Sequence, residues 1–170
     1  TLRGVGDSLV FKNQDDYYRG IFSLYEFNTT APIEIRNQRE KRKTAKAHGE
    51  QFSVDNRDLL VEILAFWLMP NHIHLLVRQI KNNGITKFMR KLGAGYAAYF
   101  NKKYNRRGHL FQGRFYAVHI KNDGQLKTVF VYIHTNGISL IEPKWKELGI
   151  KNSKKVIKFL EDYKWSSYQD

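Results

Sequence analysis

Two histidines separated by a single residue, His72 and His74, lie inside the apolar run FWLMPNHIHLLV at residues 66–77. On a β-strand, residues i and i+2 point to one face and residue i+1 to the other. The two imidazoles would therefore project side by side, and such a pair on a rigid strand suits a divalent cation. The pattern is short, and two hydrogen-bonded surface histidines explain it equally well.

A second pair of polar side chains, Tyr132 and Asn136, lies in the segment VFVYIHTNG. They are four residues apart on a predicted helix, so they are neighbours on one side of it. At ~100° per residue both lie on the flank of the stripe expected to face the core, where a phenol can reach a site that a sheet presents. His134 lies on the other flank and is not expected to be a ligand. Taken alone, Tyr132 is equally well an ordinary half-buried aromatic. The expected core stripe consists of Leu126, Val129, Phe130 and Ile133.

A sheet and a helix are needed to hold these side chains. Residues 58–69 are apolar and long enough to be either helix or strand. Pro70 and Asn71 would end this segment with a turn, and residues 72–80 read as a strand, so the two predict an antiparallel pair at the sheet centre. The other expected elements are a strand end in 1–11, helices at 15–27 (capped by Asp15) and 85–104, a strand at 115–120, a helix from Asn122 or Asp123 to about Asn136, and a helical tail over 144–162.

The resulting order, β-α-β-β-α-β-α, begins with the six elements of the split βαβ, ferredoxin-like pattern. The sequence therefore predicts an α+β fold: a single domain over 1–170 with an antiparallel sheet, helices on one face, and a C-terminal helix and tail at 144–170. Residues 28–57 are polar and basic without a period, which predicts a basic insertion or loop. A merely solvated face is the alternative. This fold hosts many functions and does not select one.

The composition narrows the class of partner. The chain has 170 residues with 29 Lys and Arg against 16 Asp and Glu, which gives a formal net charge of +13. Such an excess favours a polyanion, with nucleic acid ahead of an anionic membrane surface. The absence of cysteine excludes disulfides and thiolate metal sites. No run approaches the ~20 apolar residues of a membrane span and no secretory signal is recognisable, so we expect a cytoplasmic protein with no membrane partner.

Four motifs, in order along the chain, resemble those of the single-tyrosine HUH transposases, named after a histidine-hydrophobic-histidine motif. They are MPNHIHLLV, GHLFQGRF, YIHTN and the tail YKWSSYQD. The closest branch is the REP-associated tyrosine transposases. The resemblance covers most of the chain and is weakest over 28–57. It departs at Gly137, where relatives commonly have proline, and no role transfers to the basic stretch 36–46.

The resemblance implies a chemistry for the polar residues. Tyr132 would be the nucleophile, leaving a 5′-phosphotyrosine, and His72, His74 and Asn136 would bind a divalent metal, Mg²⁺ or Mn²⁺. The partner would be single-stranded DNA with hairpins, and the protein would act as a monomer or homodimer. The resemblance identifies no general base.

A basic turn after the helix predicted at 85–104 carries the candidate DNA contacts. The expected phosphate contacts are Lys102, Lys103, Arg106, Arg107 and Arg114. Tyr104, Phe111 and Phe115 are interleaved with them and could stack bases. His109 and Gln112 belong to the motif GHLFQGRF and are expected to line the DNA groove. The alternative is that the aromatics are core residues and the charges are solvated.

The leading hypothesis is a metal-dependent single-strand DNA endonuclease and strand transferase. An HUH replication initiator or relaxase would use the same chemistry without transposition. A non-catalytic nucleic-acid-binding module on a ferredoxin-like sheet needs neither the paired histidines nor the tyrosine-asparagine pair. A domesticated transposase that binds DNA without cutting it is a further alternative.

Overall fold

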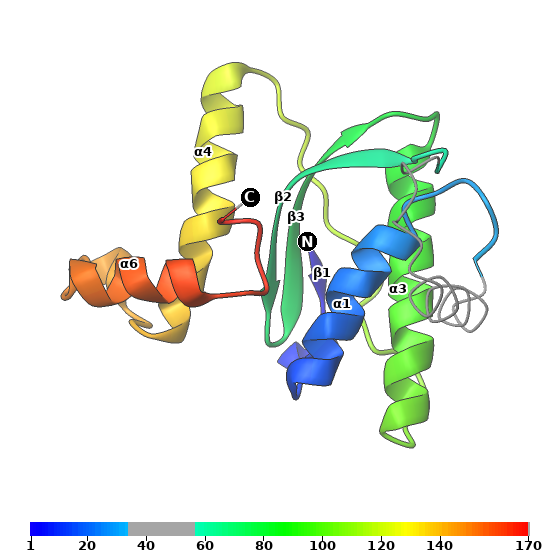
Figure 1. Ribbon diagram of the computed structural model, residues 1–170, viewed down its shortest axis with the longest axis horizontal. Coiled ribbons are helices and arrows are strands. Elements are labelled where there is room, and N and C mark those ends of the chain that lie inside the picture. Colours follow the sequence, from blue (N-terminus) through cyan, green and yellow to red (C-terminus); the bar gives the residue numbers. More distant parts are fainter. Residues whose placement is uncertain (34–56, 170) are drawn as a thin grey trace, which may run out of the picture.

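The computed structural model describes residues 1–33 and 57–169, and Figure 1 shows a small sheet between two groups of helices. The predicted basic insertion therefore lies, for residues 34–56, outside the described part of the chain, as does the stretch 36–46. Within the described residues no helix is long and apolar enough to cross a membrane. The elements are β1 (Leu2–Arg3), α1 (Gln14–Glu26), β2 (Val61–Met69), β3 (His72–Gln79), α3 (Gly84–Lys103), α4 (Asp123–Thr135), α5 (Trp145–Leu148), α6 (Ser153–Asp162) and the 3₁₀ turns Val5–Asp7 and Asn136–Leu140.

The sheet is antiparallel in the order β1-β3-β2. A tight turn at Pro70 and Asn71 joins β2 to β3, so the ambiguous segment 58–69 is resolved as a strand. The register pairs Trp67 with His74 and Met69 with His72. The central strand β3 thus carries both histidines, and its neighbours fix the direction of their side chains.

The strand predicted at 115–120 is not formed. Residues 111–116 instead run beside β1, where a fourth strand would lie in the split βαβ order. Their pairing is limited to the Gly4–Phe111 bridge and a few hydrogen bonds, including the amide of Gln112 to the Arg3 carbonyl at 2.8 Å. Gly113 has a φ of +62°, which interrupts an extended chain. β1 comprises only two residues, so it offers little backbone for a partner strand.

A β-bulge in β2 changes which face each of its side chains reaches. Ile63 pairs with Val77 and Ala65 with Leu76, which leaves Leu64 as the extra residue. Before the bulge, Val61 and Ile63 face the same core as α1 and α3. After it, the side chains of Ala65, Trp67 and Met69 enter the second core, on the opposite face.

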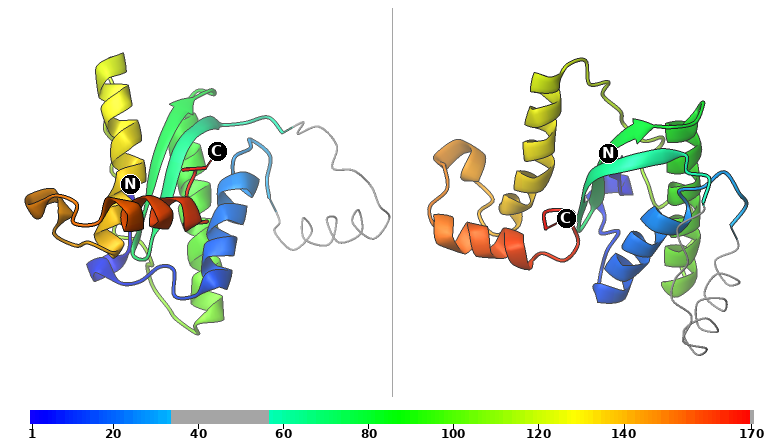
Figure 2. Two further views of the ribbon diagram at one scale, coloured as in Figure 1. Left: turned by 60° about the vertical axis from the view of Figure 1, so that its left-hand side comes forward. Right: turned by 45° about the horizontal axis from the view of Figure 1, so that its top comes forward.

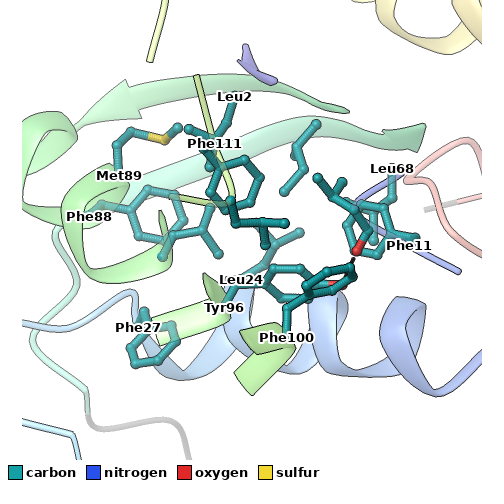
Figure 3. Close-up of a cluster of buried hydrophobic side chains, with 14 of the residues drawn as sticks. Leu2, Phe11, Leu24, Phe27, Leu68, Phe88, Met89, Tyr96, Phe100 and Phe111 are labelled. Atoms are coloured by element: carbon teal, nitrogen blue, oxygen red, sulfur yellow. Dashed lines mark hydrogen bonds between the residues drawn. The ribbon is translucent and has the colours of Figure 1, made fainter. Parts of the chain in front are cut away.

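Helices cover both faces of the sheet, as the two views in Figure 2 show. The larger core lies between the sheet and the pair α1 and α3, and Figure 3 shows its aromatic centre around Phe88, Tyr96 and Phe100. The smaller core is formed by α4, α6 and the other face of the sheet. The α+β class with an antiparallel sheet is confirmed. The expectation of helices on one face describes α1 and α3, whereas α4 and α6 lie on the second face.

Two helices, α1 and α4, start at asparagine caps. The Asn13 side chain accepts a hydrogen bond from the Asp16 amide at 3.2 Å, so Asn13 rather than Asp15 caps α1. The Asn122 side chain accepts one from the Gln125 amide at 2.8 Å and caps α4, as expected. In the stripe predicted for α4, Phe130 is wrongly placed, because it is 44% exposed.

The C-terminal tail returns to the sheet edge. The Leu68 amide donates to the Trp165 carbonyl at 2.9 Å and the Ser167 amide donates to the Phe66 carbonyl at 3.1 Å. The Trp165 ring stacks on Tyr17 of α1, with ring centroids 5.0 Å apart. The tail therefore ties α6 to the sheet and to α1.

Candidate active site

His72 and His74 project from β3 toward α4, side by side as strand alternation requires. Both are buried, with exposed fractions of 6% and 8%. Their Nε2 atoms lie 2.9 Å apart, and the ring planes meet at 78°. The predicted pair is therefore a buried, convergent one, and the alternative of two surface histidines is wrong.

Helix α4 lies across this face and brings the second predicted pair to the histidines. The Asn136 Nδ2 atom is 2.8 Å from His74 Nε2. The Tyr132 ring meets the His74 ring edge to face, with centroids 5.8 Å apart and an interplanar angle of 89°. Asn136 is 8% exposed and Tyr132 44% exposed, so the amide is enclosed while the phenol borders on solvent. The four side chains come from β3, from α4 and from the 3₁₀ turn that follows α4, and they form one cluster.

Close packing and a hydrogen bond hold α4 in this place. Gly137 lies so near the sheet that a β-carbon there would be 1.9 Å from Cζ2 of Trp67. His134 is buried on the other side of the helix, where its Nε2 atom is 3.0 Å from the Ser167 hydroxyl of the tail. His134 therefore joins α4 to the tail, in keeping with the expectation that it is not a ligand.

Burial keeps both site imidazoles uncharged at neutral pH. Desolvation, with a smaller effect of the Arg3 charge, lowers the pKa of His72 to about 4. Desolvation, then the proximity of His72, lowers the pKa of His74 to about 3. A neutral imidazole retains a ring lone pair, which is the form that binds metals.

The hydrogen-bonding groups of the cluster do not all find complementary partners. The Asn71 side-chain oxygen lies 2.6 Å from His72 Nδ1, so this nitrogen carries the ring proton and His72 Nε2 carries a lone pair. The Asn136 amide donates to His74 Nε2, which gives that atom a lone pair too. Two lone pairs then face each other across 2.9 Å with no proton between them.

A divalent cation would remove this mismatch. Both lone pairs point at the same space, and a half-turn of the Asn136 amide replaces its nitrogen by its oxygen, a ligand that Mg²⁺ and Mn²⁺ accept. Across residues 1–33 and 57–169 no group of three or more His, Cys, Asp or Glu side chains could hold a metal. The set that fits a cation here is thus His72, His74 and Asn136.

One further polar side chain at the site was missed by the sequence analysis. The Lys146 ammonium of α5 lies 4.8 Å from the centroid of the Tyr132 ring and 3.5 Å from Asn136 Oδ1. Lys146 belongs to a lysine-rich segment, and nothing in the local pattern distinguishes it from its neighbours. Only the path of the chain from α4 to α5 brings it to the tyrosine.

Some of the side chains predicted to contact DNA are held by other groups of the protein, and the others are free. The Lys103 ammonium donates to the buried Asp16 carboxylate at 2.8 Å. Arg106 donates to the Asn101 side chain and to the His109 carbonyl. These two cations support the fold. The other five predicted contacts are exposed and their side chains make no hydrogen bond or ion pair with another described residue: Lys102, Arg107, His109, Gln112 and Arg114.

The segment that carries the free side chains runs toward the histidines. Its pairing with β1 places Gln112 beside Arg3, and Arg3 in turn pairs with His72 across β1 and β3. Residues paired directly across strands share a face. Gln112 therefore lies on the histidine face of the sheet, two strands away from His72.

The aromatics predicted to stack on bases are engaged in packing. Phe111 is 8% exposed and lies within the larger core beside Leu2, as Figure 3 shows. Phe115 packs against the same core. The Tyr104 hydroxyl donates to Asp16 at 2.6 Å, and its ring packs on Phe100. These aromatics therefore pack in or against the larger core, as the alternative expects.

A comparison with protein-family models matches the part of the chain that contains this site. The family model described as "Transposase IS200 like" matches residues 25–136, more than half of the chain. The matched region contains both histidines and Tyr132, and it ends at Asn136. Searches of the curated proteins and of the solved structures gave no match. The chain belongs to the family of IS200-like transposases.

Proposed function

We propose that the chain is a metal-dependent endonuclease and strand transferase that acts on single-stranded DNA through Tyr132. The observation that supports this proposal best is the position of α4, which sets Tyr132 and Asn136 against His72 and His74. A binding module has no use for a buried histidine pair beside a half-exposed phenol. The motifs GHLFQGRF and YKWSSYQD further favour the REP-associated branch and target sites flanked by hairpins.

The reaction would begin with the phosphate of a single strand placed over the histidine cluster. Mg²⁺ or Mn²⁺ held by His72, His74 and Asn136 would supply Lewis acidity at a non-bridging phosphate oxygen. A neutral phenol is a poor nucleophile, so Tyr132 loses its proton to solvent during the attack. Its Oη atom forms a bond to phosphorus, the bond from phosphorus to O3′ breaks, and O3′ leaves with the electron pair and takes up a proton.

The product of this step is a 5′-phosphotyrosine on the protein and a free 3′-hydroxyl on the DNA. The covalent bond conserves the energy of the phosphodiester, so a second 3′-hydroxyl can attack it and join new ends without a nucleotide cofactor. The phenol is a better leaving group than an alkyl hydroxyl, which makes the return step accessible. Half-exposure of Tyr132 leaves room for both strands.

Strand-specific labelling tests the proposal. Single-stranded oligonucleotides from the sequences that flank the gene, hairpins included, are incubated with the protein in Mn²⁺ or in EDTA and separated on a denaturing gel. We expect a metal-dependent adduct that carries a 3′-end label, while a 5′-end label appears on a shorter, protein-free strand. Tyr132→Phe should lose the adduct and keep DNA binding.

Tyr116→Phe is the matched control, because Tyr116 is 72% exposed and its hydroxyl makes no hydrogen bond with another described residue. An adduct that persists in Tyr132→Phe would refute the nucleophile assignment. An adduct that carries the 5′-end label would refute the 5′-phosphotyrosine. Intact binding without any adduct would favour a binding module.

A further inference from the structure

A single cation lies against the proposed nucleophile. The Lys146 ammonium is 4.8 Å from the centre of the Tyr132 ring and 3.5 Å from the side-chain oxygen of Asn136. Among residues 1–33 and 57–169 no other lysine or arginine has such a contact with Tyr132. Lys146 therefore lies where a phosphate attached to, or approaching, this phenol would need a counter-charge.

The backbone that carries Lys146 is well anchored. Trp145 packs into the core formed by α4 and α6, and its amide donates to the Glu142 carbonyl at 3.1 Å. The amides of Glu147 and Leu148 close a helical turn on the Lys144 carbonyl. Lys146 itself is exposed. Its reach to Tyr132 thus follows from a fixed backbone, which limits the entropy lost when it contacts an anion.

The charge of Lys146 has no carboxylate partner within the described residues. Lys103, in contrast, is bound to Asp16, and Lys81 to Asp58. The neighbours of Lys146 are an aromatic ring, an amide oxygen and, further in, His74. A cation in such a place repels other positive charge, and its charge also opposes protonation of His74. An anion at this site would therefore be attracted to it.

We propose that Lys146 is a catalytic residue that contacts the phosphate during its transfer to and from Tyr132, an inference that rests on the proposed function. Its ammonium group stabilises the negative charge that builds on the non-bridging oxygens and on the phenolic oxygen. Lys146 takes no part in the proton transfers: the proton of Tyr132 still goes to solvent and O3′ still takes one up. In the return step, the same cation stabilises the departing phenolate.

The first test measures single-turnover adduct formation at saturating DNA and Mn²⁺. Removal of one charged group that acts in the transition state costs about 100-fold or more in rate, and this is the loss expected for Lys146→Met. Lys146→Arg should retain most of the rate. Lys144→Met makes the same charge change on the same segment and should remain within about twofold of the wild type.

A further readout on Lys146→Met separates a catalytic role from a structural one. Mn²⁺ affinity, measured by calorimetry, should stay equal or increase, because a repelling charge is gone and the Asn136 oxygen is released. Damage to the fold would instead lower both the rate and the Mn²⁺ affinity.

Chemical rescue exploits the absence of cysteine from the chain. Lys146→Cys should be inactive, and alkylation with 2-bromoethylamine, which rebuilds an ammonium group of similar reach, should restore adduct formation. Alkylation with iodoacetamide should not. A Lys146→Met variant within about twofold of the wild type would overturn this inference and leave the proposed function intact. An absence of adduct in the wild type would overturn both.

Discussion

The fold keeps the imidazole rings of His72 and His74 neutral at pH values well below the usual pKa of histidine. The unfolded chain binds protons at these rings near pH 6.5, whereas the folded chain resists protonation down to about pH 4 at His72 and about pH 3 at His74. Unfolding therefore takes up protons in this window, and the free energy of unfolding falls as the pH drops from 7 to 4. For His72 the change from 6.5 to about 4 corresponds to roughly 3 kcal/mol.

Urea unfolding in EDTA at a series of pH values checks this expectation. The double variant His72→Gln/His74→Gln should lose much less stability between pH 7 and pH 4 than the wild type. The buried Asp16 carboxyl titrates below this pH range. Both proteins contain it, so its contribution to the free energy of unfolding cancels in the comparison. If the free energy of unfolding depended equally on pH in the two proteins, the histidine pair would be accessible to water in the folded state.

At the residue scale, the sequence predicts those contacts that follow from local geometry. Alternation on a strand placed His72 and His74 together, and helical spacing placed Tyr132 beside Asn136. Contacts that depend on the path of the chain could not be predicted from the sequence. Lys146 meets Tyr132 only through the turn Asn136–Leu140 and α5, and the Lys103 to Asp16 ion pair joins residues far apart in sequence. The metal, the DNA contacts and the nucleophile remain predictions.

At the scale of elements, the packing of α4 on the sheet depends on the missing side chain of Gly137. A β-carbon at Gly137 would lie 1.9, 2.4 and 2.6 Å from three ring atoms of Trp67. Overpacking of a well-filled core typically costs about 1–3 kcal/mol, so Gly137→Ala should lose roughly 3 kcal/mol and reduce adduct formation by displacing Tyr132.

A double-mutant cycle checks the contact. Gly137→Ala should cost much less in a Trp67→Phe background, where the second ring is absent, and the coupling is read from chemical denaturation. Gly124→Ala, near the start of the same helix, is the control, because a β-carbon there meets only the Asn122 side-chain oxygen at 3.4 Å. Additive effects of Gly137→Ala and Trp67→Phe would contradict the contact.

Apolar periodicity predicted α1, α3 and α4 to within a residue or two, because each has a polar face, and α1 and α4 also start at an asparagine cap. The strand expected at 115–120 failed for a reason that lies outside that segment. A strand needs a partner, and its prospective partner β1 has two residues. Tyr116 and Val118, which would alternate with buried residues in a strand, are 72% and 60% exposed.

At the scale of the whole molecule, the net charge of +13 predicts DNA binding that weakens steeply with salt. For single strands the slope of log K against log salt is about −0.7 per phosphate contact. Replacement of the free cations Lys102, Arg107 and Arg114 by glutamine should therefore reduce the slope by about 2. Fluorescence anisotropy with a labelled hairpin oligonucleotide at several salt concentrations measures it.

The matched control replaces three exposed lysines of α6, Lys154, Lys155 and Lys158, by glutamine, which changes the net charge by the same amount. Their replacement should leave the slope nearly unchanged. Lys103→Met should also leave the slope unchanged while lowering stability, because its charge is committed to Asp16. A slope that falls equally in both triple variants would show that binding follows total charge and not the segment beside β1.

The bulge at Leu64 has a consequence for how this gene tolerates change in length. Loss of that one codon would remove the bulge and restore strict alternation in β2, while Ile63 still faced α1 and α3 and Trp67 still faced α4. Gain or loss of one residue elsewhere in the strand, with the bulge kept, would instead turn every side chain of one half to the wrong side of the sheet. Among relatives, loss of the bulge residue should therefore be the tolerated change in length, and the spacing from the bulge to the histidines should be held more strictly than the identity of the apolar residues between them.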